Sequence, residues 1–530
     1  MSKSGASTLR DYSADSRMIV VSVLAAGLGA VCAVLAWVLI RLIGLATNLF
    51  YFHRWAFVEV EPADAPMHWW SIFIPVVGGL MVGAIARYGA KNIRGHGMPE
   101  AVEAVVFGGA KVDPKVAVLK PVATAISIGS GGPFGAEGPV IASGGAVGSV
   151  LGQLLPLTDA ERSVMLVAGA AAGMAAAFYC PLSAVLLAVE LLLFEWRPRS
   201  LVPVTMACVT AAAVRRLLLG AAPIFAMPPT TVVMHHQALV GALAVGVVMA
   251  FLAIGLNTAI HWCEAQWEKL PIHWMWYPAL GGLIVGVGGY FFPRALGVGY
   301  GTITDFVNQD WTWTLVLGVL TVKVVIWVGS LSSNTAGGIL APLLMIGAAS
   351  GAAMGHWLPW ISPGAWAAVG MVSLLAASIG APLTSAMLAV ELTHNGGLTL
   401  PVLLACMTAY ALSALLQPRS MLTAGLSRKG KHLSREYGVD PLEMVTVGEV
   451  MSLVEGPLDA PEMSIGEGET LKAAAEKMAL SEAEVIPVVD VAGNVVGLLR
   501  MMDLLKARAK SAQREGDRER VIRMKWPLGR

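Results

Sequence analysis

The sequence has 530 residues, of which 56% are apolar and only 13% are charged, with a formal net charge of +1. Soluble domains carry about 25% charged residues, so this is the composition of a membrane protein, and nothing in the charge balance indicates nucleic-acid binding. Charges are sparse from about residue 18 to residue 425 and frequent afterwards. We therefore expect a large membrane domain followed by one small globular domain. The five scattered cysteines are expected to be small core residues rather than disulfides or metal ligands.

Residues 1–17 are polar and lack the cleavage pattern of a signal peptide, so we interpret them as a cytoplasmic tail. The apolar run from Met18 to about Phe52 is long enough to cross about 30 Å of hydrocarbon with considerable tilt. Later apolar runs are shorter and are repeatedly interrupted by glycine and proline. Irregular backbone at membrane depth is tolerated only where it is buried in protein or lines a polar cavity. The chain is therefore expected to build a polar site inside the membrane.

An internal duplication organises the membrane domain into halves of about residues 69–220 and 272–425. PVVGGLMVG at 75–83 returns as PALGGLIVG at 278–286, and PLSAVLLAVEL returns as PLTSAMLAVEL in the same register. Duplicated halves with interrupted helices are typical of transporters, in which the binding site lies near the midplane between the halves. The repeat alone leaves the relative orientation of the halves open. Glycines that recur at every fourth position are interpreted as sites of close helix packing; they are residues 144, 148 and 152 in one half and 347, 351 and 355 in the other.

Three glycine-rich stretches each precede an expected helix start: RGHGMPE at 94–100, GPFGAEGP at 132–139 and AGGILAP at 336–342. The second lacks the Lys-Ser/Thr pair of a phosphate-binding loop, which argues against an ATPase. Backbone N–H groups at a helix start are unpaired donors with partial positive charge, and glycine lets an ion approach them closely. Several such starts that converge would replace the hydration shell of an anion. We therefore predict an anion site within the membrane.

Glu137 is the carboxylate of the central stretch. A carboxylate in front of amide donors can occupy the position of the anion itself and can leave when it is protonated or displaced. Intramembrane carboxylates are costly and are functional by default. The alternative is that Glu137 only caps a helix start.

The chain changes character from about Val445. The sequence predicts a helix, a strand at VIPVVD, a turn at AGN, a strand at VVGLL and a final helix. The segment begins acidic and ends in a basic tail at 511–530, which is expected to be exposed.

The membrane domain resembles the CLC chloride channel and transporter family. GHGMPE resembles the family's GSGIPE element, GAEGP its GREGP, GGILAP its GGIFAP, and Lys120 matches the family's spacing before Glu137. The resemblance covers about residues 18–430. It implies an all-α polytopic membrane protein with two inverted repeats of tilted and broken helices. It also implies a homodimer in a lipid bilayer, the plasma or inner membrane, with one chloride pathway per subunit and both termini cytoplasmic.

By resemblance, Glu137 corresponds to the gating glutamate of the family. The backbone amides near Ile339 and Leu340 correspond to donors of the central anion site, and those of Ala136, Glu137 and Gly138 to donors of the outer site. The full set of predicted anion-binding positions is His96, Gly97, Met98, Ala136, Gly138, Ile339 and Leu340.

Several positions depart from the family pattern. Ala136 replaces the motif arginine, Leu340 replaces a phenylalanine, and Met421 or Leu422 stands at the inner-gate position where the family has a tyrosine. His96 replaces the central serine. A neutral imidazole can donate one N–H to an anion and a protonated one binds it more strongly, so we predict a pH dependence through His96. The alternative is that His96 turns away and the backbone binds the anion.

The residue after Glu190 bears on the transport mechanism. Family exchangers commonly carry an acidic proton acceptor there, whereas this chain has Leu191. That favours passive, channel-like chloride conduction. Chloride/proton exchange remains the alternative, because Glu190, His96 or a water chain can substitute, and fluoride-selective exchange is a further one. Glu190 and its repeat partner Glu391 are expected to have structural roles.

An enzyme is not expected, because no H-E-x-x-H or G-x-S-x-G motif is present, and neither a metal nor a cofactor is predicted. Residues 431–510 are interpreted as a linker and a single copy of a domain that resembles a CBS domain. Such modules work in pairs, which a homodimer would complete. The family's nucleotide element corresponds to Arg500 and Asp503, so adenine-nucleotide binding stays open beside a role in dimerisation or folding.

Overall fold

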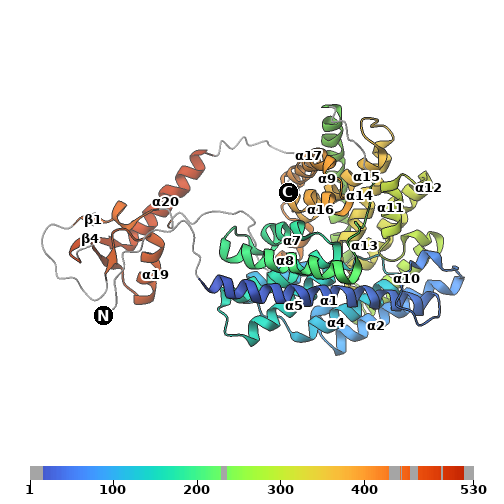
Figure 1. Cartoon of the computed structure of the whole chain (residues 1–530), viewed down its shortest axis with the longest axis horizontal. Coiled ribbons are helices and arrows are strands. Elements are labelled where there is room, and N and C mark those ends of the chain that lie inside the picture. Colours follow the sequence, from blue (N-terminus) through green and yellow to red (C-terminus); the bar gives the residue numbers. More distant parts are fainter. Residues whose placement is uncertain are drawn as a thin grey trace. The chain divides into compact units, whose positions relative to one another are not determined.

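The computed structural model describes residues 16–227, 236–428, 442, 445–453, 464–490 and 493–518. These residues belong to two compact units, a large helical one that ends with the helix at 421–428 and a small one that begins at residue 442 (Figure 1). Residues 1–15 of the expected N-terminal tail, most of the expected linker and residues 519–530 of the expected basic tail lie outside the described residues.

The large unit is a multi-pass helical assembly. Seven of its described helical segments are long and apolar enough to cross a membrane. Its α-helices are α1 Arg17–Tyr51, α2 Ile74–Tyr88, α3 Met98–Val106, α4 Pro114–Gly129, α5 Glu137–Leu154, α6 Asp159–Phe178, α7 Pro181–Leu187, α8 Pro198–Leu219, α9 His236–Trp267, α10 Tyr277–Phe291, α11 Tyr300–Asn308, α12 Trp313–Gly318, α13 Val324–Ser332, α14 Leu340–Gly355, α15 Pro363–Ile379, α16 Pro382–Thr393, α17 Thr399–Leu416 and α18 Met421–Arg428.

The first helix confirms the predicted first span. At 1.5 Å per residue its 35 residues extend about 52 Å, so α1 is long enough to cross about 30 Å of hydrocarbon with considerable tilt. Many of its buried residues are small, and a Cβ on Gly29 would overlap the carbonyl oxygen of Ala207 in α8. Small residues at this contact let α1 and α8 lie against each other along much of their length (Figure 1).

The repeat appears in the structure as a set of reciprocal contacts. A Cβ on Gly79 of α2 would overlap the carbonyl oxygen of Pro278, and a Cβ on Gly282 of α10 would overlap that of Pro75. When two equivalent segments contact each other in this isologous way, a two-fold axis relates them. The two halves of the membrane unit are therefore related by a pseudo-two-fold axis, which agrees with the expected inverted repeats.

The glycine ladders pack neighbouring helices, as the sequence predicted. A Cβ on Gly144 of α5 would overlap the carbonyl oxygen of Gly169 in α6. The equivalent pair in the second half is α14 and α15, where a Cβ on Gly347 would lie 2.6 Å from the carbonyl oxygen of Gly370. These Cβ-to-oxygen distances, 2.3 Å for Gly144 and 2.6 Å for Gly347, are below normal van der Waals contact. Only glycine therefore lets these backbones approach each other.

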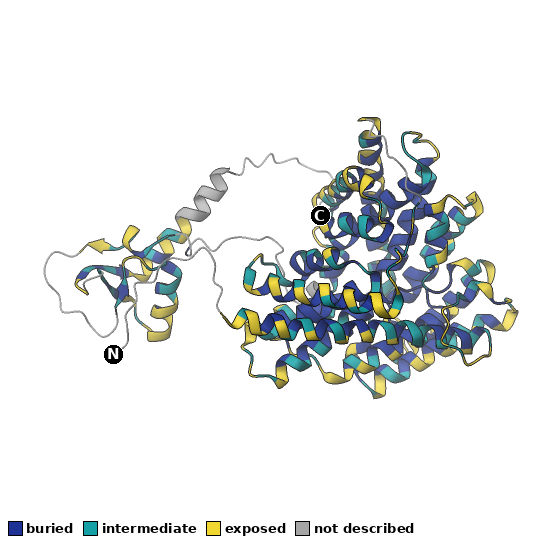
Figure 2. Ribbon diagram, in the orientation of Figure 1, coloured by how far each residue is buried: buried dark blue, intermediate teal, exposed yellow. Residues whose placement is uncertain are grey.

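Several central helices are buried on all sides. Figure 2 shows α14 and α15 almost entirely in the colour of buried residues, and in α15 every residue after Pro363 is buried. A helix that is apolar all round belongs in the interior of a large protein. These helices shield the irregular backbone around them from lipid, as irregular backbone at membrane depth requires. The five cysteines are free thiols and four of them are buried, as expected.

Glu190 and Glu391 cap helices of the opposite half. Glu190 lies in a π-helical turn, η4 at Ala188–Leu193, and its carboxylate accepts hydrogen bonds from the N–H groups of Leu383 and Thr384 at the start of α16. The carboxylate of Glu391 accepts the equivalent bonds from Leu182 and Ser183 at the start of α7. A carboxylate at a helix start satisfies orphan N–H groups and complements the helix dipole. Both residues thus make the contacts expected of a structural role.

The described residues of the small unit form a four-stranded sheet with two α-helices. Its strands follow the order β1-β4-β3-β2, and its elements are β1 Ser452–Leu453, β2 Ile465–Gly466, α19 Leu471–Ser481, β3 Val485–Val489, β4 Val495–Arg500 and α20 Met501–Arg518. β3 and β4 are antiparallel, whereas β2 and β3 are parallel. The predicted succession of helix, strand, turn, strand and helix is confirmed. Burial alternates along β4, where Val495, Gly497 and Leu499 are buried, and Leu499 belongs to the unit's own apolar core.

Candidate functional site

The three glycine-rich stretches meet at one place in the membrane unit. Gly135 and Gly338 form an antiparallel backbone pair, in which each N–H donates to the carbonyl oxygen of the other residue, at 3.0 and 2.8 Å. A Cβ on Gly138 would overlap the carbonyl oxygen of His96, so the first stretch lies directly against the start of α5. The first half of the chain therefore contributes two walls of this site and the second half contributes one.

Each stretch ends where a helix begins. α3 begins after Gly97, which has a φ of 92°, α5 begins at Glu137 and α14 begins at Leu340. The first N–H groups of a helix have no partner within it and form its positive end. Three such ends in one place provide backbone donors for an anion. The structure thus brings together all the predicted anion-binding positions, namely His96, Gly97, Met98, Ala136, Gly138, Ile339 and Leu340.

The Glu137 carboxylate is fully buried within this site. Its Oε1 accepts a hydrogen bond from the hydroxyl of Tyr300. The N–H groups of Glu137 and of Ala341, in the first turn of α14, lie close to the carboxylate, although Oε2 has no regular hydrogen bond with the described residues. Gly135 leaves room for the group, because a Cβ there would overlap Oε2. A carboxylate, itself an anion, therefore lies between the starts of α5 and α14.

Tyr300 and Ala341 are site residues that the sequence analysis missed. Tyr300 begins α11 and follows Gly297 and Gly299, which stand 202 residues after Gly95 and Gly97. The loop before α11 is therefore the repeat partner of the GHG loop before α3. The duplication contained the signal, because the partner of a loop that lines the site is itself placed near the site by the two-fold relation.

Two buried lysines fix these partner loops. The ammonium of Lys120 donates to the carbonyl oxygens of Arg94 and Gly95, at 3.4 and 3.1 Å. The ammonium of Lys323 donates to those of Ala295 and Gly297, at 2.9 and 2.8 Å. Each lysine thus binds the loop that precedes a short helix, α3 or α11. Lys120, whose spacing before Glu137 matches the family, thus holds the GHG loop beside the start of α5.

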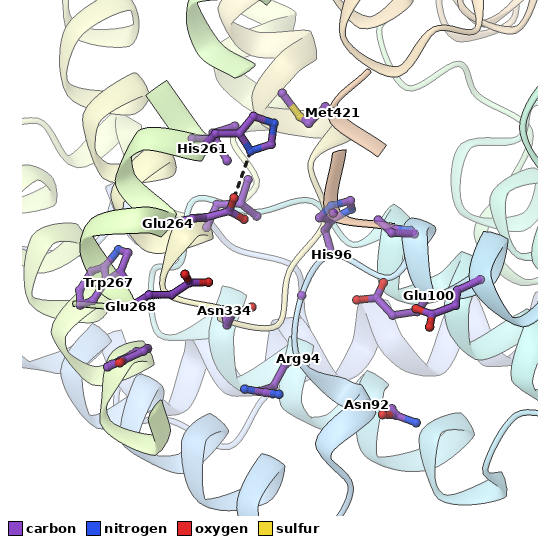
Figure 3. Close-up of a pocket in the computed structure, with 17 residues that line it drawn as sticks. Asn92, Arg94, His96, Glu100, His261, Glu264, Trp267, Glu268, Asn334 and Met421 are labelled. Carbon is purple, nitrogen blue, oxygen red and sulfur yellow. Dashed lines mark hydrogen bonds and ion pairs between the residues drawn. The ribbon is translucent and has the colours of Figure 1, made fainter. Parts of the chain in front are cut away.

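A polar cavity of about 360 Å³ opens beside the site and is called the vestibule below. His96 lines it, and Nδ1 of its imidazole has no hydrogen bond with the described residues. Opposite His96, α9 contributes the hydrogen-bonded pair of His261 and Glu264, whose Nδ1 and Oε2 are 3.1 Å apart (Figure 3). The carboxylates that line the vestibule are Glu100, Glu103, Glu264 and Glu268.

The predicted inner-gate and proton-acceptor positions lie in different surroundings. Met421 and Leu422, at the start of α18, are both buried in the apolar core, and Met421 also lines the vestibule near His96 (Figure 3). Leu191 is 1% exposed within the same core and lies in the π-helical turn that follows α7. A buried leucine among apolar neighbours can neither accept nor donate a proton.

The predicted nucleotide element of the small unit is engaged locally. Oδ2 of Asp503 accepts a hydrogen bond from the backbone N–H of Arg500, at 3.1 Å, and so caps the start of α20. The side chain of Arg500 is exposed. Among the residues that the structure describes, no group of three or more His, Cys, Asp or Glu side chains has the arrangement of a metal site.

Comparison with known proteins gives matches along the membrane unit. The family described as "Voltage gated chloride channel" matches residues 78–414. A ClcB-like chloride channel protein of Ralstonia nicotianae is 30% identical over 371 residues, which cover 68% of this chain and 86% of that relative. The voltage-gated ClC-type chloride channel ClcB of Salmonella dublin is 29% identical over 374 residues, which cover 68% of this chain and 88% of that relative.

Solved structures share the fold. A slow cyanobacterial Cl⁻/H⁺ antiporter matches with a TM-score of 0.66 and 24% identity, over 78% of this chain and 96% of its own. A CLC-type fluoride/proton antiporter matches with a TM-score of 0.65 and 18% identity, over 76% and 97%. A eukaryotic CLC transporter matches with a TM-score of 0.63 and 18% identity, over 93% and 90%. These structures therefore share the fold of this chain, with its broken helices and its two related halves.

Proposed function

The chain belongs to the voltage-gated chloride channel family, and on this premise we propose that it carries chloride and similar anions across a membrane, along a pathway gated by Glu137. The pathway runs from the vestibule past His96 to the meeting point of the starts of α3, α5 and α14. Backbone N–H groups at these starts supply the donors that replace the hydration shell of the anion.

The position of the Glu137 carboxylate is the observation that supports this proposal most. The group is fully buried, lies between two helix starts and is not neutralised by a cationic side chain within ion-pair distance among the described residues. Burial of a carboxylate without such a partner is costly unless the surroundings are built to hold an anion. A chloride ion in the same space would meet the same donors, so the carboxylate and the ion compete for it.

Chloride flux from liposomes tests the proposal. Vesicles that contain the purified protein should release chloride faster than protein-free vesicles. Glu137→Gln removes the competing negative charge while it keeps the size of the side chain, so flux should rise and should no longer depend on acid to displace the gate. Wild-type flux no greater than that of protein-free vesicles would exclude the proposed function.

Channel-like conduction is the form of transport that Leu191 favours. The position is apolar and buried, so it offers no proton acceptor. Chloride/proton exchange is the second candidate, and the vestibule favours it, because carboxylates and imidazoles such as Glu264 and His261 can carry protons. Fluoride-selective exchange is a weaker candidate that rests on the replacement of the family serine by His96. Reversal potentials under combined chloride, fluoride and proton gradients separate the three: a value that follows chloride alone supports the channel.

The same proposal places the protein in the plasma or inner membrane as a homodimer, with one pathway per subunit and both termini in the cytoplasm. Cysteine accessibility from each side of oriented vesicles tests the topology. Mass determination of the purified protein, corrected for detergent, tests the dimer.

We propose that the small unit is a single CBS-like domain that pairs with its copy in the homodimer. Support comes from its four-stranded sheet with two helices and from exposed apolar side chains at the start of α20, at Met501, Met502 and Leu505. Pairing would remove this apolar surface from water. Disulfide cross-linking of a Met502→Cys variant tests the pairing. Calorimetry with ATP and an Arg500→Ala variant tests adenine-nucleotide binding, for which Asp503 offers little support because it already caps α20.

A further inference from the structure

We propose that Tyr300 is the latch that holds the Glu137 carboxylate across the anion pathway, an inference that rests on the proposed function. The hydroxyl of Tyr300 donates to Oε1 of Glu137. The two residues come from opposite halves of the chain, since Glu137 begins α5 and Tyr300 begins α11. A carboxylate of the first half is therefore held closed by a donor of the second half.

The backbone around Tyr300 is anchored on three sides. The N–H of Gly297 donates to the carbonyl oxygen of Gly131, at 3.0 Å, which ties the loop before α11 directly to the glycine-rich stretch before α5. Lys323 holds the carbonyl oxygen of Gly297 at 2.8 Å. On the other side of Tyr300, Oε1 of Glu61 accepts a hydrogen bond from the N–H of Gly301, at 2.9 Å. These bonds fix the start of α11 relative to Glu137.

The ring of Tyr300 is held by two aromatic side chains. Its centroid lies 5.7 Å from that of Phe225, with an interplanar angle of 75°, and 6.4 Å from that of Phe178, with an angle of 52°. Edge-to-face contacts of this kind orient a ring within an apolar site. Phe178 belongs to α6, and the N–H of Phe225 is hydrogen-bonded to the carbonyl oxygen of Leu392 in α16. The hydroxyl is therefore presented to Glu137 by a ring that is fixed independently of that bond.

The strength of the latch depends on how few other hydrogen bonds the Glu137 carboxylate accepts. Oε2 has no regular hydrogen bond with the described residues, so the hydroxyl of Tyr300 is the one side-chain donor to this group among them. Loss of a hydrogen bond to a charged group should lower the occupancy of the closed position about tenfold to a hundredfold relative to open positions. An anion that competes for the same space should then bind more tightly, by up to the same factor.

Tyr300→Phe is the variant that tests the latch, because it removes the hydroxyl and keeps the ring that contacts Phe178 and Phe225. Chloride flux from liposomes and chloride affinity by calorimetry are measured for the wild type, Tyr300→Phe, Glu137→Gln and the double variant. Tyr290→Phe is the matched control, since the same atom is removed from an exposed tyrosine in α10. Tyr300→Phe should raise flux and tighten chloride binding several-fold or more, whereas Tyr290→Phe should match the wild type.

The double variant separates a latch from a merely structural role. In the Glu137→Gln background no negative charge remains to be held and the amide oxygen is a weaker acceptor, so the added Tyr300→Phe substitution should change flux and affinity much less than it does beside Glu137. If Tyr300→Phe equals the wild type while Glu137→Gln raises flux, the latch is overturned and the proposed function stands. If Tyr300→Phe lowers flux in both backgrounds, the hydroxyl serves folding and the latch is again overturned. Absence of chloride flux and chloride binding in all four proteins would overturn the proposed function together with the latch.

Discussion

Glu190→Ala and Glu391→Ala form a matched pair of perturbations, one in each half of the membrane unit. Each alanine removes the acceptor of two backbone N–H groups and one hydroxyl. Glu190 accepts from the N–H of Leu383 at 3.1 Å and from the N–H and the hydroxyl of Thr384 at 2.8 and 2.6 Å. Glu391 accepts from the equivalent groups of Leu182 and Ser183. Loss of a helix cap costs about 0.5–2 kcal/mol, and a hydrogen bond to a charged group contributes about 1.5–3 kcal/mol. Both carboxylates are half-buried, so water can replace part of the loss. We expect each variant to lose about 3 kcal/mol of stability.

Thermal unfolding in detergent, followed by size-exclusion chromatography with fluorescence detection, measures this loss. Both alanine variants should unfold at a lower temperature than the wild type, by similar amounts, because the two caps are equivalent under the pseudo-two-fold axis. Glu190→Gln and Glu391→Gln keep one carbonyl acceptor and should lie between alanine and wild type. Purified variants that remain folded should transport chloride with the same dependence on the proton gradient as the wild type.

A different outcome for the two residues would refute this reasoning. If Glu190→Ala unfolds at the wild-type temperature but loses a response to the proton gradient, while Glu391→Ala does neither, then Glu190 acts in proton transfer. The missing carboxylate at Leu191 would then have a substitute one position earlier, and chloride/proton exchange would become the better description of the protein.

Two further predictions follow from close packing and from the vestibule. Gly79→Ala should destabilise the membrane unit by about 1–3 kcal/mol, because the added Cβ would overlap a carbonyl oxygen of α10. Gly27→Ala should be neutral or slightly stabilising, because no atom lies within 4 Å of a Cβ at that position. Thermal unfolding of the two variants measures the difference. His96→Ser should flatten the pH dependence of chloride flux or chloride affinity, because a protonated imidazole binds an anion more strongly than a hydroxyl does; an unchanged pH profile would show that His96 takes no part. The charged and titratable groups around His96 include Glu100, Lys120 and Glu264, and Arg94, Glu103, His261 and Glu268 line the same cavity.

Much of the membrane unit was predictable because glycine and proline mark it so strongly. The register of the repeat predicted which helices would be equivalent, and the close approach of Gly79 to α10 and of Gly144 to α6 confirms the packing role of those glycines. The three glycine-rich stretches predicted the helix starts that meet around Glu137. Backbone chemistry of this kind is local, so the sequence alone contains it.

The partners of Glu137 were not predictable in the same way. Tyr300 lies 163 residues from Glu137 along the chain, and a tyrosine at the start of an apolar helix has no local feature that distinguishes it from a packing residue. Its role depends on the two-fold relation that brings α11 back to α5, together with the aromatic contacts that orient its ring. The resemblance to the family predicts a site tyrosine at residue 421 or 422 instead, where this chain has Met421 and Leu422. The hydroxyl beside Glu137 is supplied from a different element, α11.

The vestibule shows a second limit of sequence reasoning. His261, Glu264 and Glu268 stand near the end of a long apolar helix, where charged side chains usually mark the membrane surface. In the folded unit they line the same cavity as His96. Which residues share a cavity depends on the crossing of distant helices, and spacing along one helix contains no information about that crossing.

The backbone pair between Gly135 and Gly338 has a consequence for how the protein is made. The first half leaves the ribosome roughly 200 residues before the second, and until then the peptide groups of Gly135 and the carboxylate of Glu190 have no partners. Neither half can complete its own site within lipid, since each supplies what the other lacks. Only a full-length chain, or two fragments inserted together, can therefore complete these contacts.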